Sequence, residues 1–219
     1  RDAAPYKAVL THGFVLDEKG RPMSKSVGNV VAPEKVIKQY GAEILRLWVA
    51  TQDYRNDTRV GDAILKQVSE AYRRIRNTAR YILGNIHDFD PATDTVADKD
   101  LLEIDRWALS RLEELVNRVL KSYESYDFHV LYHAVHNFCS VDMSAFYLDV
   151  LKDRLYTSPT ESLERRSAQT AMHRILEALT RMMAPVLSFT AEEIWGFIPG
   201  EREESVHLAE FPSFEDSLI

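Results

Sequence analysis

Apolar residues recur every three or four positions along most of the chain, which is the period of amphipathic α-helices. Between residues 62 and 86 they stand at Ile64, Val68, Tyr72, Ile75, Ala79, Ile82 and Ile86. The same period predicts helices over 102–120, 128–151 and 158–183, the last of them ended by a proline at position 185. We therefore expect an antiparallel helix bundle to occupy most of the chain.

Two capping patterns predict where later helices begin. Ser158 is followed by Pro159 and Glu161, and a serine cap, a proline at the first helical position and a glutamate in the first turn together favour a helix start. Thr190 with Glu193 offers a second capping box. These patterns predict helices that start at residues 158 and 190.

The beginning of the chain has a different pattern. "YKAVLTHGFVL" is rich in strand-forming residues, and "DEKG" at 17–20 is a turn signal. Pro33 suits the first turn of a short helix that Gly41 ends, and "AEILRLWVA" starts another. The polar stretch "TQDYRNDTR" then breaks the pattern. We predict a small α/β part over 1–55 and a helix bundle over 56–219.

Composition and charge limit the classes of protein. With 219 residues, 45% hydrophobic and 28% charged, the chain has the composition of a soluble globular protein, and no apolar run approaches the roughly 20 residues of a membrane span. Its net charge of −7 means that contact with nucleic acid must be local. Cys139 is its one cysteine, which excludes an internal disulfide and fits the cytosol. Because the chain starts at Arg1 without a leader, we interpret it as part of a longer cytoplasmic protein.

The segment "RPMSKSVGN" has the chemistry of a loop that contacts phosphate. Lys25 is a compact charge on a flexible stem, Ser24 and Ser26 can donate hydrogen bonds, and Gly28 allows the backbone to bend. It is not a Walker-type P-loop. From the residues alone, an exposed turn in which the lysine is only a solvated surface residue remains an alternative.

"HGFVLDEKGRPMSKSVGN" closely resembles the signature segment of class I aminoacyl-tRNA synthetases, whose second motif is usually written KMSKS. "GAEILRLWVATQDYRNDTRV" and "EAYRRIRNTARYILGNIHDFDP" are most similar to the isoleucyl-tRNA synthetases of that class. "APVLSFTAEEIW" is similar to a stretch in the anticodon-binding domain of isoleucyl and valyl enzymes. The resemblance runs from about Tyr6 to Phe211.

This resemblance implies a mainly α fold. The end of a Rossmann-type catalytic domain and a connecting fold would occupy residues 1–55, and a helical anticodon-binding domain residues 56–219. It also implies that Met23, Ser24, Lys25 and Ser26 form the ATP-contacting loop. Lys25 would stabilise pyrophosphate while isoleucine and ATP, with Mg²⁺, form the aminoacyl-adenylate.

Two features depart from a complete enzyme of this class. The first lysine of the KMSKS motif is replaced by Pro22, so that Arg21 or Lys19 would have to supply its charge. The H-I-G-H motif, the amino-acid pocket and the editing domain are absent. The chain is therefore expected to be a C-terminal piece, inactive alone. Its partners would be tRNA(Ile) and the N-terminal catalytic and editing portions of the same polypeptide, in a monomeric enzyme.

Four basic residues of the first long helix are candidates for contact with the tRNA backbone: Lys66, Arg73, Arg76 and Arg80. At about 100° per residue they fall within a sector of roughly 80° beside the apolar stripe. Such contacts position RNA without reading its sequence. The alternative is a solvated face on which arginines pair with acidic neighbours.

Anticodon reading requires aromatic or arginine side chains that can stack on unpaired bases. The candidates are Trp195, Tyr147, Tyr156, Arg165 and Arg166, among which the sequence does not choose. Four other aromatic residues stand at helical spacing and are predicted to pack in the core: Trp107, Phe128, Phe138 and Phe146.

His133, His136 and Cys139 lie one turn apart on one side of a predicted helix. A structural zinc site needs four protein ligands, and no partner motif accompanies these three. We predict histidines satisfied within the bundle and no metal site. Two alternatives to an isoleucyl enzyme remain: a stand-alone tRNA-binding module without catalysis, and the matching part of a valyl-tRNA synthetase.

Overall fold

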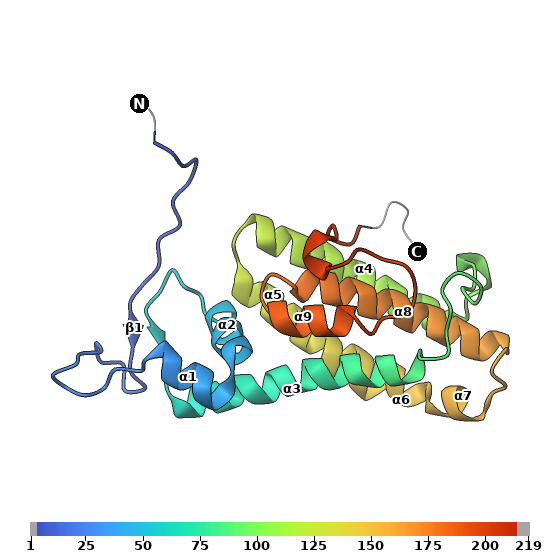
Figure 1. The fold of residues 1–219 in the computed structure, drawn as a ribbon, viewed down its shortest axis with the longest axis horizontal. Helices are drawn as coiled ribbons and strands as arrows, with labels where there is room; N and C mark the ends of the chain where they lie inside the picture. Colours follow the sequence, from blue (N-terminus) through green and yellow to red (C-terminus); the bar gives the residue numbers. More distant parts are fainter. Residues whose placement is uncertain (1–3, 214–219) are drawn as a thin grey trace.

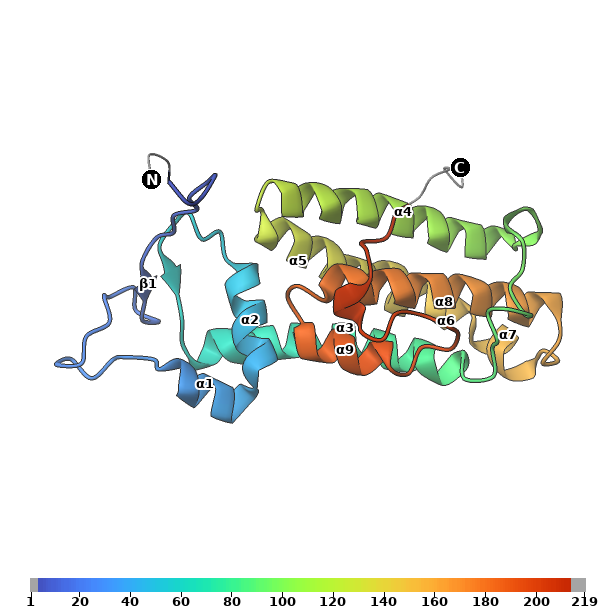
Figure 2. The same ribbon diagram turned by 45° about the horizontal axis from the view of Figure 1, so that its top comes forward.

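The computed structural model describes residues 4–213, which form a helix bundle with a smaller α/β part at one end (Figure 1). The bundle contains α3 (Asp62–Asn85), α4 (Glu103–Glu124), α5 (Phe128–Asn137), α8 (Leu163–Met183) and α9 (Ser188–Trp195). The short helices α6 (Leu148–Val150) and α7 (Lys152–Thr157) and the 3₁₀ turns Asp98–Asp100 and Val206–Leu208 complete it. The long helices run side by side (Figure 2), which confirms the predicted mainly α fold.

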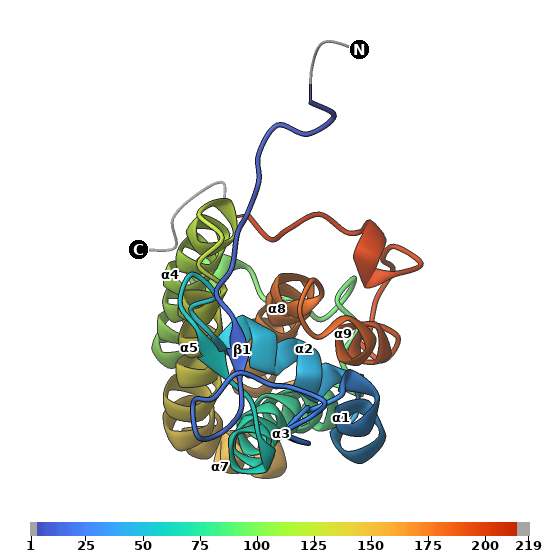
Figure 3. The ribbon, with the colours of Figure 1, turned by 90° about the vertical axis from the view of Figure 1, so that its left-hand side faces the viewer.

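Helix α8 forms the centre of the bundle. Seen from the α/β end, it lies between α9 on one side and α4 with α5 on the other, while α3 runs along the bottom (Figure 3). Most residues of α8 are buried, including Met172, Ile175 and Leu176. None of the helices within residues 4–213 is long and apolar enough to span a lipid bilayer.

The α/β part consists of two short strands and two helices. Strand β1 (Val15–Leu16) pairs in parallel with β2 (Thr58–Arg59), and α1 (Pro33–Tyr40) and α2 (Ala42–Thr51) lie between them in sequence. The expected β-rich start is shorter than predicted. Residues such as Tyr6 and Val9 are exposed and meet no strand within the described residues, because β2 is only long enough to pair with Val15–Leu16.

The boundaries of the first helices agree with the sequence. Pro33 is the first residue of α1, where its missing N–H would be unpaired in any case. Gly41 ends α1 with a φ of 89°, in the left-handed region that favours glycine. Helix α2 packs against α3, α5 and α9, and the buried indole of Trp48 donates a hydrogen bond of 3.1 Å to the carbonyl of Arg59. The α/β part is thereby joined to the bundle.

The predicted helix over 128–151 contains a wider turn. Helix α5 passes into a π-helical segment, Phe138–Tyr147, before α6 begins. The buried hydroxyl of Thr78, on α3, lies 3.3 Å from the carbonyl of Cys139 and 3.2 Å from Ser144 Oγ. A side chain that enters the backbone hydrogen-bond ladder is a recognised cause of such a distortion.

Both predicted capping boxes are wrong. Helix α8 begins five residues later than expected, because Ser162 is its cap: the Ser162 hydroxyl accepts the N–H of Arg165 at 3.3 Å. Helix α9 begins at Ser188, and Thr190 lies inside it, with its hydroxyl 2.9 Å from that of Tyr72. The Thr190 hydroxyl is thus used by a tertiary contact inside α9, and at α8 a later serine takes the place of Ser158 as the cap.

Candidate functional site

One carboxylate, that of Asp17, organises the base of the loop. Its Oδ1 accepts the backbone N–H groups of Lys19 at 3.0 Å and Arg21 at 2.8 Å. Its Oδ2 accepts Arg21 Nε at 2.9 Å and Asn29 Nδ2 at 3.0 Å. These hydrogen bonds, with that from the Asn29 side chain the largest, hold the pKa of Asp17 well below its usual range. The carboxylate is therefore ionised at neutral pH.

Asn29 closes the loop from its other end. Its Oδ1 accepts the N–H of Ser24 at 2.9 Å, and its Nδ2 also donates to the carbonyl of Pro22 at 3.1 Å. Gly28, just before it, has a φ of 74°, and its N–H lies 3.1 Å from the carbonyl of Ser24. The backbone therefore bends at Gly28, as the sequence predicts.

The tip of the loop presents polar groups to solvent. Lys25 is exposed, and its ammonium has no hydrogen-bond or ion-pair partner among the residues that the structure describes. The hydroxyls of Ser24 and Ser26 lie 2.7 Å apart. Met23 is half-buried and packs against the core, with its Sδ 3.4 Å from the N–H of Val31. Lys25 and Ser26 are thus exposed, Ser24 is half-buried, and Met23 anchors the loop.

The two residues expected to replace the missing motif lysine have different surroundings. Arg21 lies at the base of the loop, where its Nη2 is 2.8 Å from Asp17 Oδ2, so that its charge is compensated. Lys19 is exposed, and its ammonium has no partner in the described part of the chain. Pro22 forms a β-bridge with Leu16. Lys19 is therefore the more available cation of the two.

The same turn also anchors the first long helix. Oε1 of Glu18 accepts the N–H of Ala63 at 3.0 Å, in the first turn of α3. A carboxylate at this position is favoured by the positive end of the helix dipole. Asp17 and Glu18 are adjacent, so one turn holds both the loop and the start of the helix that carries the predicted basic residues.

Most of the predicted basic residues of α3 are paired with acids. Lys66 lies 2.7 Å from Asp62, Arg73 pairs with Glu70, and Arg76 lies 3.7 Å from Glu193 of α9. Arg80 is exposed and has no ion-pair partner within residues 4–213. All these groups are on the surface, where ion pairs are weak and exchange readily with other partners. The arrangement agrees with a solvated face, and an RNA backbone could still replace the carboxylates.

An aromatic residue that the sequence pattern does not indicate lies beside this helix. Phe197 is 70% exposed and, with Arg76 and Arg80, lines a shallow cavity of about 170 Å³ between α3 and the end of α9. An exposed ring next to two guanidinium groups has the chemistry that binds unpaired bases and phosphates. Phe197 follows the last helix, outside any periodic pattern, and only the tertiary fold brings it next to α3.

The five anticodon-reading candidates are mostly in the interior. Trp195 is buried and its indole donates to the carbonyl of Glu203 at 2.9 Å, while the buried hydroxyl of Tyr147 donates to Asp105 at 2.8 Å. The side chains of Arg165 and Arg166 are only 14% and 10% exposed. Tyr156, 66% exposed, is the one member of the group on the surface.

The four aromatic residues predicted to pack in the core do so to different degrees. Phe138 is buried, and Phe128 and Trp107 are partly buried against the core. Phe146 remains 45% exposed, although its ring packs edge-on against Trp107 with the ring centroids 4.9 Å apart. The packing prediction is confirmed for Phe138 and is incomplete for Phe146.

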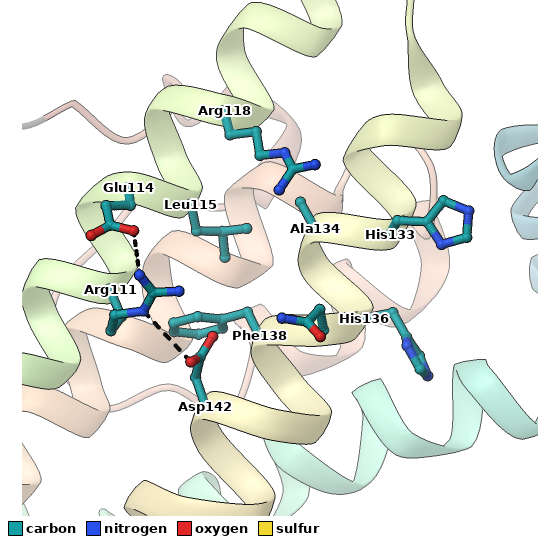
Figure 4. Close-up of a pocket in the computed structure, with 10 residues that line it drawn as sticks. Arg111, Glu114, Leu115, Arg118, His133, Ala134, His136, Phe138 and Asp142 are labelled. Carbon is teal, nitrogen blue, oxygen red and sulfur yellow. Dashed lines mark hydrogen bonds and ion pairs between the residues drawn. The ribbon is translucent and has the colours of Figure 1, made fainter.

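A cleft of about 410 Å³ between α4 and α5 has His133 and His136 among its lining residues (Figure 4). Arg111 pairs there with Glu114 and lies 3.5 Å from Asp142, whereas His133 and His136 point away from this cluster. Burial, helped by nearby positive groups, lowers the pKa of His136. Residues 4–213 contain no group of three His, Cys, Asp or Glu side chains arranged to hold a metal ion.

A family model described as "Anticodon-binding domain of tRNA ligase" matches residues 105–219, which is more than half of the chain. The chain belongs to this tRNA ligase family. A second model, "tRNA synthetases class I (I, L, M and V)", matches residues 1–61 and includes the loop. The predicted boundary between residues 55 and 56 stays a prediction.

Relatives of this chain include two bacterial enzymes named "Isoleucine--tRNA ligase". That of Syntrophotalea carbinolica is 71% identical over 218 residues and that of Geobacter sulfurreducens is 63% identical over 224 residues. Both matches cover 100% of this chain but only 24% of the relative. The chain therefore spans about a quarter of the length of the relatives that it matches.

Solved structures of tRNA synthetases share the fold. The LeuRS–tRNA–LeuAMS ternary complex of Agrobacterium radiobacter K84 matches 94% of this chain with a TM-score of 0.72 and 20% identity, over 24% of its own length. Mycobacterium tuberculosis methionyl-tRNA synthetase in complex with methionyl-adenylate matches 84% of this chain and 36% of its own, with a TM-score of 0.67. At this identity the likeness concerns the fold alone.

Proposed function

We propose that this tRNA ligase chain is the part of an isoleucine–tRNA ligase that supplies the ATP-contacting loop and binds tRNA(Ile) on its anticodon side. The 71% identity to an isoleucine–tRNA ligase along the whole chain carries this proposal. The named relatives favour the isoleucyl enzyme over the valyl alternative. Their greater length favours a part of a larger enzyme over a stand-alone tRNA-binding module.

The loop would act on the first half-reaction. An oxygen of the isoleucine carboxylate attacks the α-phosphorus of ATP, the bond from that phosphorus to the bridging oxygen breaks, and pyrophosphate leaves with the electron pair. Negative charge moves onto the leaving group, and the free ammonium of Lys25 would stabilise that charge more in the transition state than in bound ATP. The hydroxyls of Ser24 and Ser26 would donate hydrogen bonds to phosphate oxygens.

The Mg²⁺ expected with ATP would be held elsewhere. The loop offers lysine and serine, which are poor ligands for a hard divalent cation. Of the two carboxylates at its base, Asp17 accepts four hydrogen bonds and Glu18 accepts the N–H of Ala63 in the first turn of α3. We therefore assign no Mg²⁺ ligand to this part of the chain. The ion would enter with the nucleotide.

The exposed surface around Arg76, Arg80 and Phe197 would contact the tRNA. The cations would meet backbone phosphates, with Lys66 and Arg73 extending the contact along α3, and the ring would stack on a base. Local positive charge of this kind is compatible with the overall charge of −7. The complete enzyme would act as a monomer in the cytoplasm, together with its N-terminal catalytic and editing portions.

The test compares the full-length protein with the 219-residue chain. The full-length protein should catalyse isoleucine-dependent exchange between ATP and pyrophosphate and should transfer isoleucine to tRNA(Ile). The chain alone should bind tRNA but catalyse no exchange, because it lacks an amino-acid pocket. Exchange that depends on valine rather than isoleucine, or none with either, would overturn the proposal.

A further inference from the structure

Asp17 and Asn29 lie twelve residues apart in sequence, and their side chains meet with Asn29 Nδ2 3.0 Å from Asp17 Oδ2. The segment between them contains the whole phosphate-contacting loop. The tip of the loop has few other attachments: Met23 packs on the core, and the remaining hydrogen bonds join loop residues to one another. The contact between Asp17 and Asn29 therefore closes the loop at its base.

We propose that Asp17 and Asn29 form a clasp that positions Lys25 for adenylate formation. This inference rests on the proposed function of the loop. Neither residue would touch ATP: both are positioning residues that act through the backbone of the loop. They restrict the conformations of the loop, so that the Lys25 ammonium is held close to the position of the departing pyrophosphate.

The Asn29 side chain is suited to this position because it both donates and accepts. Its amide N–H groups satisfy the Asp17 carboxylate and the Pro22 carbonyl, while its oxygen receives the N–H of Ser24 one residue before Lys25. Aspartate has the same length but cannot donate when ionised. Alanine can do neither. The geometry thus distinguishes asparagine from its closest isostere.

The clasp stands on a rigid support. Asp17 directly follows β1 and is only 7% exposed. The side chain of the next residue, Glu18, accepts a hydrogen bond from the backbone N–H of Ala63 in the first turn of α3. The Arg21 guanidinium lies on the same carboxylate. Because the Asp17 side of the clasp is fixed by these contacts, Asn29 is the side whose release would free the loop.

The test uses the full-length enzyme and four variants: Asn29→Asp, Asn29→Ala, the exchanged pair Asp17→Asn with Asn29→Asp, and Lys25→Ala. Asn117→Asp, on the exposed face of α4, is the matched control for the charge change. Single-turnover adenylate formation and isoleucine affinity are measured between pH 6 and pH 8. Binding of tRNA(Ile) reports whether the bundle is intact.

We expect Asn29→Asp to slow adenylate formation at pH 8 by roughly 10- to 100-fold, the effect of a misplaced catalytic group. Isoleucine affinity and tRNA binding should not change. The defect should shrink toward pH 6, because protonation of one of two facing carboxylates restores a hydrogen bond. The exchanged pair should recover part of the rate of adenylate formation at pH 8. Asn29→Ala should form adenylate slowly at every pH. The control Asn117→Asp should form adenylate at the rate of the unaltered enzyme.

The outcomes separate this inference from the proposed function. If Lys25→Ala is slow while Asn29→Asp and Asn29→Ala keep the unaltered rate, the clasp is refuted and the function of the loop stands. If Lys25→Ala also keeps its rate, the proposed role of the loop fails. A slow Asn29→Asp variant without pH dependence or recovery in the exchanged pair would also refute the clasp.

Discussion

The guanidinium of Arg46 donates a hydrogen bond of 2.9 Å to the carbonyl of Val186, across 140 positions of sequence. Its Nη2 also donates to the carbonyl of Pro185 at 2.8 Å and lies 3.0 Å from Ser188 Oγ. Arg46 belongs to α2, and its partners form the turn between α8 and α9. This one side chain therefore fastens the α/β part that carries the loop to the end of the bundle.

Replacement of Arg46 by alanine should loosen this attachment. Hydrogen bonds from a charged donor contribute about 1.5–3 kcal/mol each, but Arg46 is an exposed residue, so we expect a total loss of about 2 kcal/mol in the free energy of unfolding. Urea denaturation of the 219-residue chain measures it. Arg46→Lys, which keeps the charge but not the planar fork, should recover less than half. Equal stability of Arg46→Ala and the unaltered chain would contradict the attachment.

A buried carboxylate network should control the stability of the other end of the bundle. Asp105 is fully buried and accepts hydrogen bonds from Tyr147 at 2.8 Å, Arg154 at 3.0 Å and Ser167 at 2.6 Å. Asp105→Ala leaves the Arg154 guanidinium without its partner and should lower the free energy of unfolding by about 3–5 kcal/mol. Tyr147→Phe, which removes one neutral donor, should lower it by about 1 kcal/mol. The reverse order of these two effects would show that Asp105 is not the centre of the network.

The proposed tRNA surface can be tested by charge and by stacking separately. Arg80→Ala should weaken binding of tRNA(Ile) to the chain and should reduce the slope of log affinity against log salt by about one. Phe197→Ala should weaken binding by about 1–3 kcal/mol with the salt slope unchanged. Arg118→Ala, an exposed arginine in the α4–α5 cleft, is the matched control and should leave affinity unaltered. If only the control weakens binding, the tRNA lies on the other face.

Cys139 should report unfolding of the bundle. It is fully buried, and burial raises the pKa of its thiol to about 12, because the charged thiolate is disfavoured away from water. Since only the thiolate reacts, alkylation of the native chain at pH 8 should be slower than in urea by roughly 1,000-fold or more. Raising the pH toward 10 should accelerate the native reaction in proportion to the thiolate fraction. Native and denatured rates within tenfold of each other would show that the bundle opens around Cys139.

The periodic helices and the loop were readable from the sequence, since both depend on residues close together in the chain. Helix α3 lies at the predicted position, as do Pro33 at the start of α1 and the end of α8 before Pro185. The resemblance identified the family, whereas the phosphate contact that the residue types of the loop predict stays a prediction. Local capping patterns were less reliable, because Thr190 bonds to Tyr72, 118 positions away, and Ser162 rather than Ser158 caps α8.

Features that depend on long-range contacts could not be read in advance. The turn signal at residues 17–20 does not indicate that the Asp17 carboxylate accepts a hydrogen bond from Asn29 at the other end of the loop. Nor does it indicate that the Glu18 carboxylate accepts the N–H of Ala63 in the first turn of α3. Phe197 has no periodic neighbours and meets Arg80 only in the folded bundle. Conversely, Trp195 and Tyr147 are candidates for base stacking from the sequence but lie in the interior, where their polar groups are hydrogen-bonded. The sequence alone does not show whether an aromatic side chain that carries a polar group is buried in this way or exposed.

The role of Lys25 is tested most directly by single-turnover adenylate formation in the full-length enzyme carrying Lys25→Ala. Lys35→Ala, an exposed lysine of α1, is the matched control. We predict a rate lower by roughly 10²- to 10³-fold, as for removal of a group that stabilises charge in a transition state, with isoleucine affinity and tRNA binding unchanged. The control should keep its full rate. A Lys25→Ala enzyme that forms adenylate within twofold of the unaltered rate would contradict the account.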